Sequence, residues 1–174
     1  MVKVRGAGGG RVSIAGVACY RPGDRPHLFY QLRVYRRRKG EAKGFTWADY
    51  RDLILATHRA LSAPLVWVWD NLNIHLAPEL AGFAQENEAW LRIYRLPAYT
   101  SDLNPAEGIW SLLKRSMVNF AAADLDALVR IIKRKLKQGG LHGEVPCSSG
   151  MNRAFSVQPP SEPGGHLLMH RALQ

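Results

Sequence analysis

The apolar run LVWVW at 65–69 constrains the fold of this 174-residue chain more than any other segment. It is apolar throughout rather than alternating, which is typical of a strand covered on both faces. The run ends directly on Asp70. In open α/β sheets, ligand sites gather at the carboxyl ends of such strands. The segment therefore predicts a buried strand with a candidate site at its end.

The segments around this strand predict a mixed-sheet α/β domain over residues 1–138. Two β-branched and aromatic-rich segments on either side of the turn RPGDRP predict a β-hairpin. Helical spacing and capping signals predict four helices, and a second apolar run predicts another strand. The expected elements are the hairpin strands 11–20 and 28–35, the strands 65–70 and 91–97, and the helices 47–61, 77–90, 104–120 and 124–137.

The last part of the chain, residues 139–174, has a different composition. It contains 6 Gly, 4 Pro and 4 Ser among its 36 positions and shows no apolar period. We expect an irregular, disordered tail there.

The positive charge is concentrated in the N-terminal third. The formal net charge is +10, with 13 Lys/Arg against 4 Asp/Glu in residues 1–60 and 4 against 6 in residues 61–118. A basic surface beside a slightly acidic middle segment suits a polyanion held near a cation site, although a solvated surface would look the same. Two cysteines and no long apolar stretch fit a cytoplasmic protein outside the membrane.

Asp70 and Glu107 are the two candidate catalytic and metal-binding carboxylates. If the strands 65–70 and 91–97 are neighbours, both side chains can face one cleft. Carboxylates that share a cleft repel each other unless a cation is present, and Mg²⁺ prefers such oxygen ligands. Each residue also has a structural explanation. Asp70 could form a turn at the strand end, and Asn104 with Glu107 has the spacing of a capping box.

The segments VWVWDNLNIH and LPAYTSDLNPAEGIWSLLK together strongly resemble the DDE transposases of the mariner type, in their bacterial insertion-sequence branch. The family pattern is a strand that ends in Asp-Asn with a His a few residues on, then Leu-Pro-x-Tyr-[Ser/Thr]-x-x-Leu-Asn-Pro-x-Glu with a later Trp and Lys. The matching positions in this chain are Asp70, Asn71, His75, Leu96, Pro97, Tyr99, Thr100, Leu103, Asn104, Pro105, Glu107, Trp110 and Lys114.

This resemblance implies an RNase H-like fold and a DNA strand-transfer site that uses two Mg²⁺ ions. Asp70 would be the second catalytic Asp and Glu107 the third acidic residue, whereas His75 has no assigned role. The family's first catalytic Asp lies on a central first strand ahead of the hairpin. Nothing acidic precedes Asp24 here, so we expect that strand to be missing and the chain to be truncated.

The partner implied by the resemblance is DNA, both transposon ends and target, with a homodimer as a further option. The candidate phosphate contacts are Arg36, Arg37, Arg38, Lys39, Lys114 and Arg115. One alternative is a non-catalytic remnant that binds DNA or dimerises. Another is a different RNase H-like nuclease such as a resolvase, which the Asn-Pro-x-Glu helix start disfavours. If the central strand is lost, residues 1–5 could replace it as a strand without a carboxylate.

Overall fold

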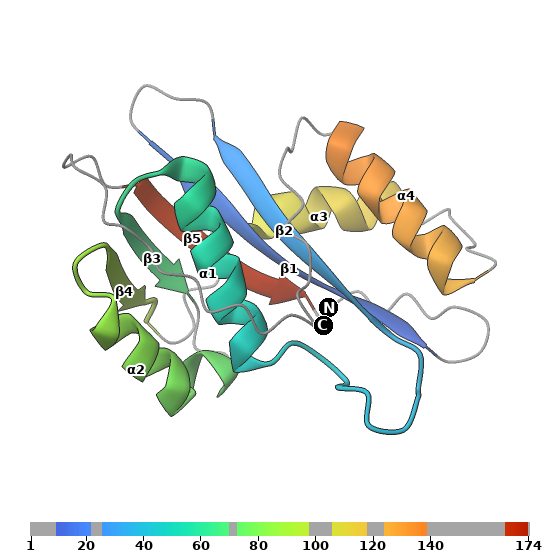
Figure 1. Ribbon diagram of the computed structural model, residues 1–174. Coiled ribbons are helices and arrows are strands. Elements are labelled where there is room, and N and C mark those ends of the chain that lie inside the picture. Colours follow the sequence, from blue (N-terminus) through green and yellow to red (C-terminus); the bar gives the residue numbers. More distant parts are fainter. Residues whose placement is uncertain are drawn as a thin grey trace.

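The computed structural model describes residues 10–21, 26–69, 73–97, 106–117 and 124–138, and the backbone of residues 166–173. These segments form one mixed five-stranded sheet with helices on both faces (Figure 1). The α/β architecture predicted from the sequence is confirmed, and it is of the RNase H-like kind.

The elements follow the predicted order, with one strand added at the end. They are β1 (Arg11–Tyr20), β2 (His27–Tyr35), α1 (Trp47–Leu61), β3 (Leu65–Trp69), the short 3₁₀ helix η1 (Asn73–Leu76), α2 (Pro78–Glu86), β4 (Leu91–Arg95), α3 (Ala106–Met117), α4 (Leu125–Gln138) and β5 (His166–Leu173). The strand order across the sheet is β2-β1-β5-β3-β4.

β5 lies in the centre of this sheet. It pairs antiparallel with β1 and parallel with β3, so it joins the β1–β2 hairpin to the β3–β4 pair. The sequence predicted little regular structure after residue 138, and the structure instead places this strand there. Its segment HLLMHRAL has no alternation of apolar and polar residues, as expected for a strand in the middle of a covered sheet. Residues 1–5, the other candidate for this place, lie outside the described residues.

The start of α1 shows how local sequence sets the position of a helix. Asp49 accepts hydrogen bonds from the Thr46 backbone N–H at 2.7 Å and from the Thr46 hydroxyl at 2.8 Å. The carboxylate of Asp49 also forms an ion pair with Arg33 on β2. The same acid therefore fixes the helix start and ties α1 to the hairpin.

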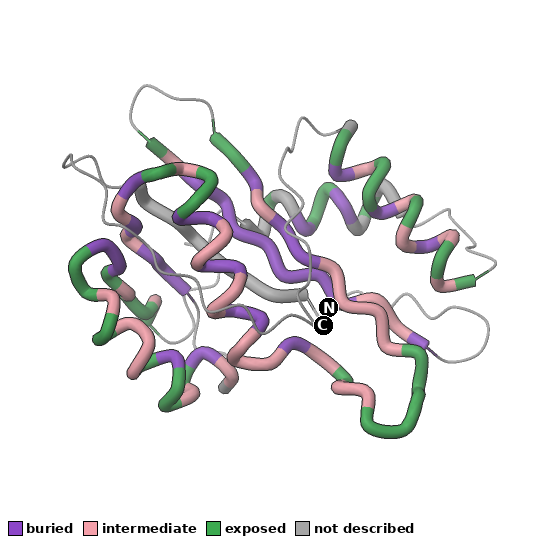
Figure 2. The backbone as a smooth tube through the Cα atoms, viewed as in Figure 1, coloured by how far each residue is buried: buried purple, intermediate pink, exposed green. Residues whose placement is uncertain are grey.

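Two apolar clusters pack against the two faces of the sheet. Figure 2 shows the buried stretches of the strands and helices in purple. The cluster under α1 and α2 contains the fully buried Trp67 and Trp69 of β3 together with Tyr50 and Leu53 of α1. The cluster under α3 and α4 is formed by Ile14, Ala18, Leu28, Tyr30, Trp110, Leu113, Leu128, Ile132 and Leu136. Each helix layer therefore buries its own face of the sheet.

Gly16 on β1 lets α3 approach the sheet closely. A Cβ atom at Gly16 would lie 2.6 Å from Cη2 and 2.7 Å from Cζ2 of the Trp110 ring. Trp110 is 0% exposed, so the ring has little room to move away. The indole of α3 therefore needs a glycine at this position of β1.

Replacing Gly16 by alanine should destabilise the fold because the methyl group overlaps the Trp110 ring. We expect a loss of about 1–3 kcal/mol in the free energy of unfolding, measured by urea denaturation. Gly108→Ala on α3 is the matched control, because a Cβ there meets nothing within 4 Å. That change should stabilise the helix by roughly 0.5–1 kcal/mol. Equal stability of the wild type and Gly16→Ala would contradict the close approach of α3.

Candidate functional site

The strand end that precedes Asp70 is held tightly in the core. Trp69 is 1% exposed, and its carbonyl oxygen accepts a hydrogen bond from the Leu96 N–H at 2.9 Å. That bond joins the carboxyl end of β3 to the segment that follows β4. Asp70, Asn71 and Leu72 themselves lie outside the described residues. Asp70 nevertheless follows directly after Trp69, whose side chain and backbone are both held in place.

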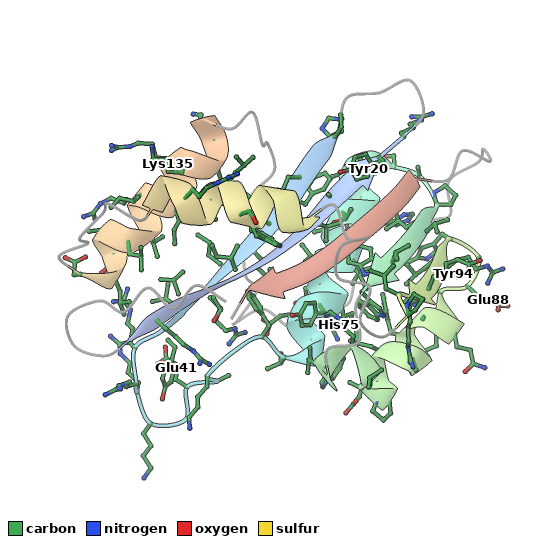
Figure 3. All side chains as sticks on the ribbon, turned by 180° about the vertical axis from the view of Figure 1, so that it is seen from behind. Tyr20, Glu41, His75, Glu88, Tyr94 and Lys135 are labelled. Atoms are coloured by element: carbon green, nitrogen blue, oxygen red, sulfur yellow. The ribbon has the colours of Figure 1, made fainter. Side chains whose placement is uncertain are left out.

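His75, in η1, is the next described anchor after Asp70 in the chain. Its ring stacks on that of Trp69, with the centroids 4.5 Å apart and an angle of 5° between the planes. It also meets the Tyr50 ring edge to face at 4.8 Å, and it is only 2% exposed (Figure 3). The sequence could not assign a role to His75. The structure places it as an anchor that returns the chain to the core five residues after Asp70.

Glu107 is positioned by the helix that carries it. It lies in the first turn of α3, and its side chain is outside the described residues, as are Asn104 and Pro105. Three positions further along, Trp110 packs on Gly16 of β1, and α3 also packs against β5. The start of α3 is therefore held against the middle of the sheet.

The contacts of Trp69 and of Trp110 lie at almost the same level along the strands of the sheet. Along β5, His170 pairs with Trp69 of β3, and the next residue, Arg171, pairs with Gly16 of β1. Trp69 and the Trp110 contact thus lie at consecutive register positions, on strands either side of β5. Trp69 belongs to the cluster under α1 and α2, whereas Trp110 belongs to the cluster under α3 and α4. That the carboxylates of Asp70 and Glu107 open onto one cleft stays a prediction, as does their separation, because neither side chain is among those described.

The residues that the structure describes do not make a metal site by themselves. Among them there is no group of three or more His, Cys, Asp or Glu side chains that could hold an ion. The sequence of β5, the central strand of the sheet, contains no Asp or Glu. Burial raises the pKa of the Cys19 thiol, which is therefore a protonated core residue rather than a ligand.

The basic loop at 36–39 is exposed and is partly organised by an acid. The Glu41 carboxylate accepts hydrogen bonds from the backbone N–H groups of Arg36 at 2.7 Å and Arg38 at 3.1 Å. The Arg36 guanidinium pairs with Asp126 at the start of α4, which lowers the pKa of Asp126 and raises that of Arg36. Three further exposed bases follow Arg36 in this loop, Arg37, Arg38 and Lys39.

This loop extends from the end of the sheet at which the candidate carboxylates are expected. β3 and β5 run toward the end of β1 at which Arg11 pairs with Tyr35, just before the loop. Five residues separate Gly16 from Arg11, which is roughly 17 Å at about 3.3 Å per residue. Of the other candidate phosphate contacts, Arg115 is exposed on α3, and the side chain of Lys114 lies outside the described set.

Sequence reasoning missed the contribution of β5 and of Gly16. No periodic signal marks the segment at 166–173, and a single glycine in a strand does not reveal which side chain will approach it. The tryptophan at 110 was part of the recognised pattern, but its partner on β1 could be found only from the fold. Among the described helices, none is long and apolar enough to cross a membrane.

A family model described as DDE superfamily endonuclease matches residues 7–129 of the chain. The match begins just before β1 and ends within α4, so it includes Asp70, His75 and Glu107 and excludes β5. No curated protein gives a significant match, and no solved structure does either.

Removing the His75 ring should loosen the chain around Asp70. We expect His75→Ala to lower the free energy of unfolding by about 2–3 kcal/mol, because a buried ring stacked on Trp69 is lost. His75→Phe keeps a ring in this place and should lose less. Leu76→Ala is the neighbouring control: Leu76 is 44% exposed, and its change should stay within about 0.5 kcal/mol of the wild type. Equal losses for His75→Ala and Leu76→Ala in urea denaturation would contradict the anchoring role.

Proposed function

Because the chain belongs to the DDE superfamily endonuclease family, we propose that it is a transposase catalytic domain that binds DNA at the carboxyl end of β3. We further propose the mariner type and its bacterial insertion-sequence branch, which the two sequence motifs favour. The observation that supports the proposal is the pair of buried tryptophans, Trp69 and Trp110, which lie one residue before Asp70 and three residues after Glu107 in the chain. The reaction class is phosphodiester cleavage followed by attack of the freed 3′-hydroxyl on a second DNA.

The roles of the carboxylates follow from their places in the fold. Asp70 follows directly after β3 in the chain, and Glu107 lies in the first turn of α3, the helix that packs against β1 and β5. In the family's chemistry such carboxylates bind Mg²⁺, and we assign Asp70 and Glu107 to that role. The sequence of β5 adds no acid to them. We therefore propose that this chain binds Mg²⁺ weakly and cuts DNA poorly.

The positive charges of the basic loop would attract DNA to this end of the molecule. The roughly 17 Å between the level of Gly16 and the loop corresponds to about five base pairs at about 3.4 Å each. A duplex that lies across the cleft would therefore reach Arg37, Arg38 and Lys39 with its phosphates. The ion pair between Arg36 and Asp126 is exposed, so it is weak and its guanidinium can turn to a phosphate.

A second candidate function is DNA binding or dimerisation without cleavage. The observation that favours it is again β5, which takes the central position of the sheet and brings no acid to it. The two functions share the DNA-binding surface and differ only in metal-dependent cleavage. Cleavage assays therefore separate them.

Substitution of the basic loop should change the salt dependence of DNA binding. The triple variant Arg37→Ala, Arg38→Ala and Lys39→Ala should flatten the slope of log K against log [salt] by about three units, near 0.9 for each lost contact. The charge-matched control replaces three exposed bases on α4, Arg130, Arg134 and Lys137, whose helix extends away from this end (Figure 3). Fluorescence anisotropy of a labelled duplex gives both slopes. An unchanged slope in the loop variant would identify that loop as a solvated surface only.

Nicking of supercoiled plasmid by the purified chain tests the catalytic half of the proposal. In Mg²⁺ we expect activity close to background, and Asp70→Ala and Glu107→Ala should remove whatever remains. Efficient cleavage that both substitutions abolish would show that two carboxylates suffice. Cleavage that neither substitution affects would overturn the assignment of the active site.

A further inference from the structure

The backbone of the basic loop forms an anion-binding arrangement of N–H groups. The N–H groups of Arg36 and Arg38 both donate to the same atom, Oε2 of Glu41, at 2.7 Å and 3.1 Å. Arg37, which lies between them, is in the left-handed region with a φ of 63°. A left-handed residue turns the N–H groups on its two sides toward one point, and such a concave set of donors binds anions. We call these two N–H groups the anion nest.

A tight turn at Gly40 brings Glu41 back to these donors. The Glu41 N–H donates to the carbonyl oxygen of Arg38 at 3.1 Å, which closes a four-residue turn. Gly40 has a φ of 80°, and several turn types require such a positive value at their third position. The backbone therefore directs Glu41 toward its own loop, and Figure 3 shows this side chain within the curve of the loop.

The acid in the nest lies beside the longest run of bases in the chain. The residues of the run, 36–39, are exposed, whereas Glu41 is partly buried. A non-glycine residue such as Arg37 stays in the left-handed region only when its surroundings hold it there. Two hydrogen bonds to a charged oxygen supply that stabilisation. The loop therefore holds one negatively charged oxygen at a fixed place among four positive side chains.

We propose that the anion nest is a binding site for a phosphate of the DNA backbone, and that Glu41 occupies it until DNA displaces the carboxylate. The inference rests on the proposed function, because it takes DNA as the source of the phosphate. A phosphate oxygen accepts the same charge-assisted hydrogen bonds from backbone N–H groups as a carboxylate oxygen. Glu41 is thus an internal competitor, and it lowers the affinity for DNA by the fraction of molecules in which the nest is filled.

Binding of a labelled duplex to the full-length chain, measured by fluorescence anisotropy at one salt concentration, tests this proposal. Glu41→Gln and Glu41→Ala both remove one negative charge. Glutamine keeps a carbonyl oxygen that can fill the nest, and alanine does not. We expect Glu41→Ala to bind DNA about tenfold more tightly than the wild type, because the competitor and its charge-assisted hydrogen bonds are lost.

The matched controls separate the nest from a simple change of charge. Glu41→Gln should gain only about twofold to threefold, since it loses the charge but keeps an acceptor. Glu86→Ala removes an exposed acid from α2 and should behave as the wild type. Equal gains in Glu41→Gln and Glu41→Ala would overturn the proposal, as would an equal gain in Glu86→Ala.

The backbone amide resonances of Arg36 and Arg38 report on the nest directly. In Glu41→Ala, inorganic phosphate at constant ionic strength should shift both resonances saturably, and the wild type should respond far less. Wild-type chain saturated with duplex carries the test if alanine changes the shape of the loop. DNA should then shift both amides together with the side-chain carboxyl carbon of Glu41. Unshifted amides of Arg36 and Arg38 in the DNA complex would overturn the proposal.

The outcomes separate this inference from the proposed function. Shifts of the two amides with inorganic phosphate in Glu41→Ala, and an unchanged salt slope in the triple loop variant, would keep the nest as a phosphate site and reject DNA as its ligand. A loop-dependent salt slope, with both amides unaffected by phosphate and by DNA, would keep DNA binding and reject the nest.

Discussion

The pairing of β5 with β1 and β3 is the interaction on which the rest of the structure depends. Without it the sheet would divide into a two-stranded antiparallel hairpin and a two-stranded parallel pair, and neither is stable alone in water. The break would also expose two rows of backbone N–H and C=O groups in the middle of the molecule. A strand from the end of the chain thus makes the core continuous between segments that are distant in sequence.

Two aromatic contacts hold the segments that carry the candidate carboxylates against this sheet. The stack of His75 on Trp69 fixes the chain on both sides of Asp70, and the Trp110 ring on Gly16 fixes the start of α3 near Glu107. Both contacts are buried, so their geometry depends on core packing rather than on mobile surface groups. β5 therefore joins β1 and β3 in one sheet, and that sheet positions the two tryptophans next to the segments that carry Asp70 and Glu107.

Much of this arrangement could be predicted from the sequence. Thr46 with Asp49 marks the start of α1, the run LVWVW marks a covered strand, and the motif around Glu107 marks α3. These signals are local, because they rest on capping chemistry and on apolar spacing. The place of β5 depends on pairing between residues more than 140 positions apart along the chain, such as Gly16 and Arg171. No local pattern encodes that pairing, so the central strand could not be predicted from the sequence.

Hydrogen exchange of the backbone amides of residues 166–173 tests the central claim most directly. A strand paired on both sides exchanges its amides only when the sheet opens, so protection close to that of β1 is predicted. Substitutions that weaken the sheet should lower the protection of both strands together. Rapid exchange of 166–173 while β1 and β3 stay protected would contradict the account, because the sheet would then hold together without β5.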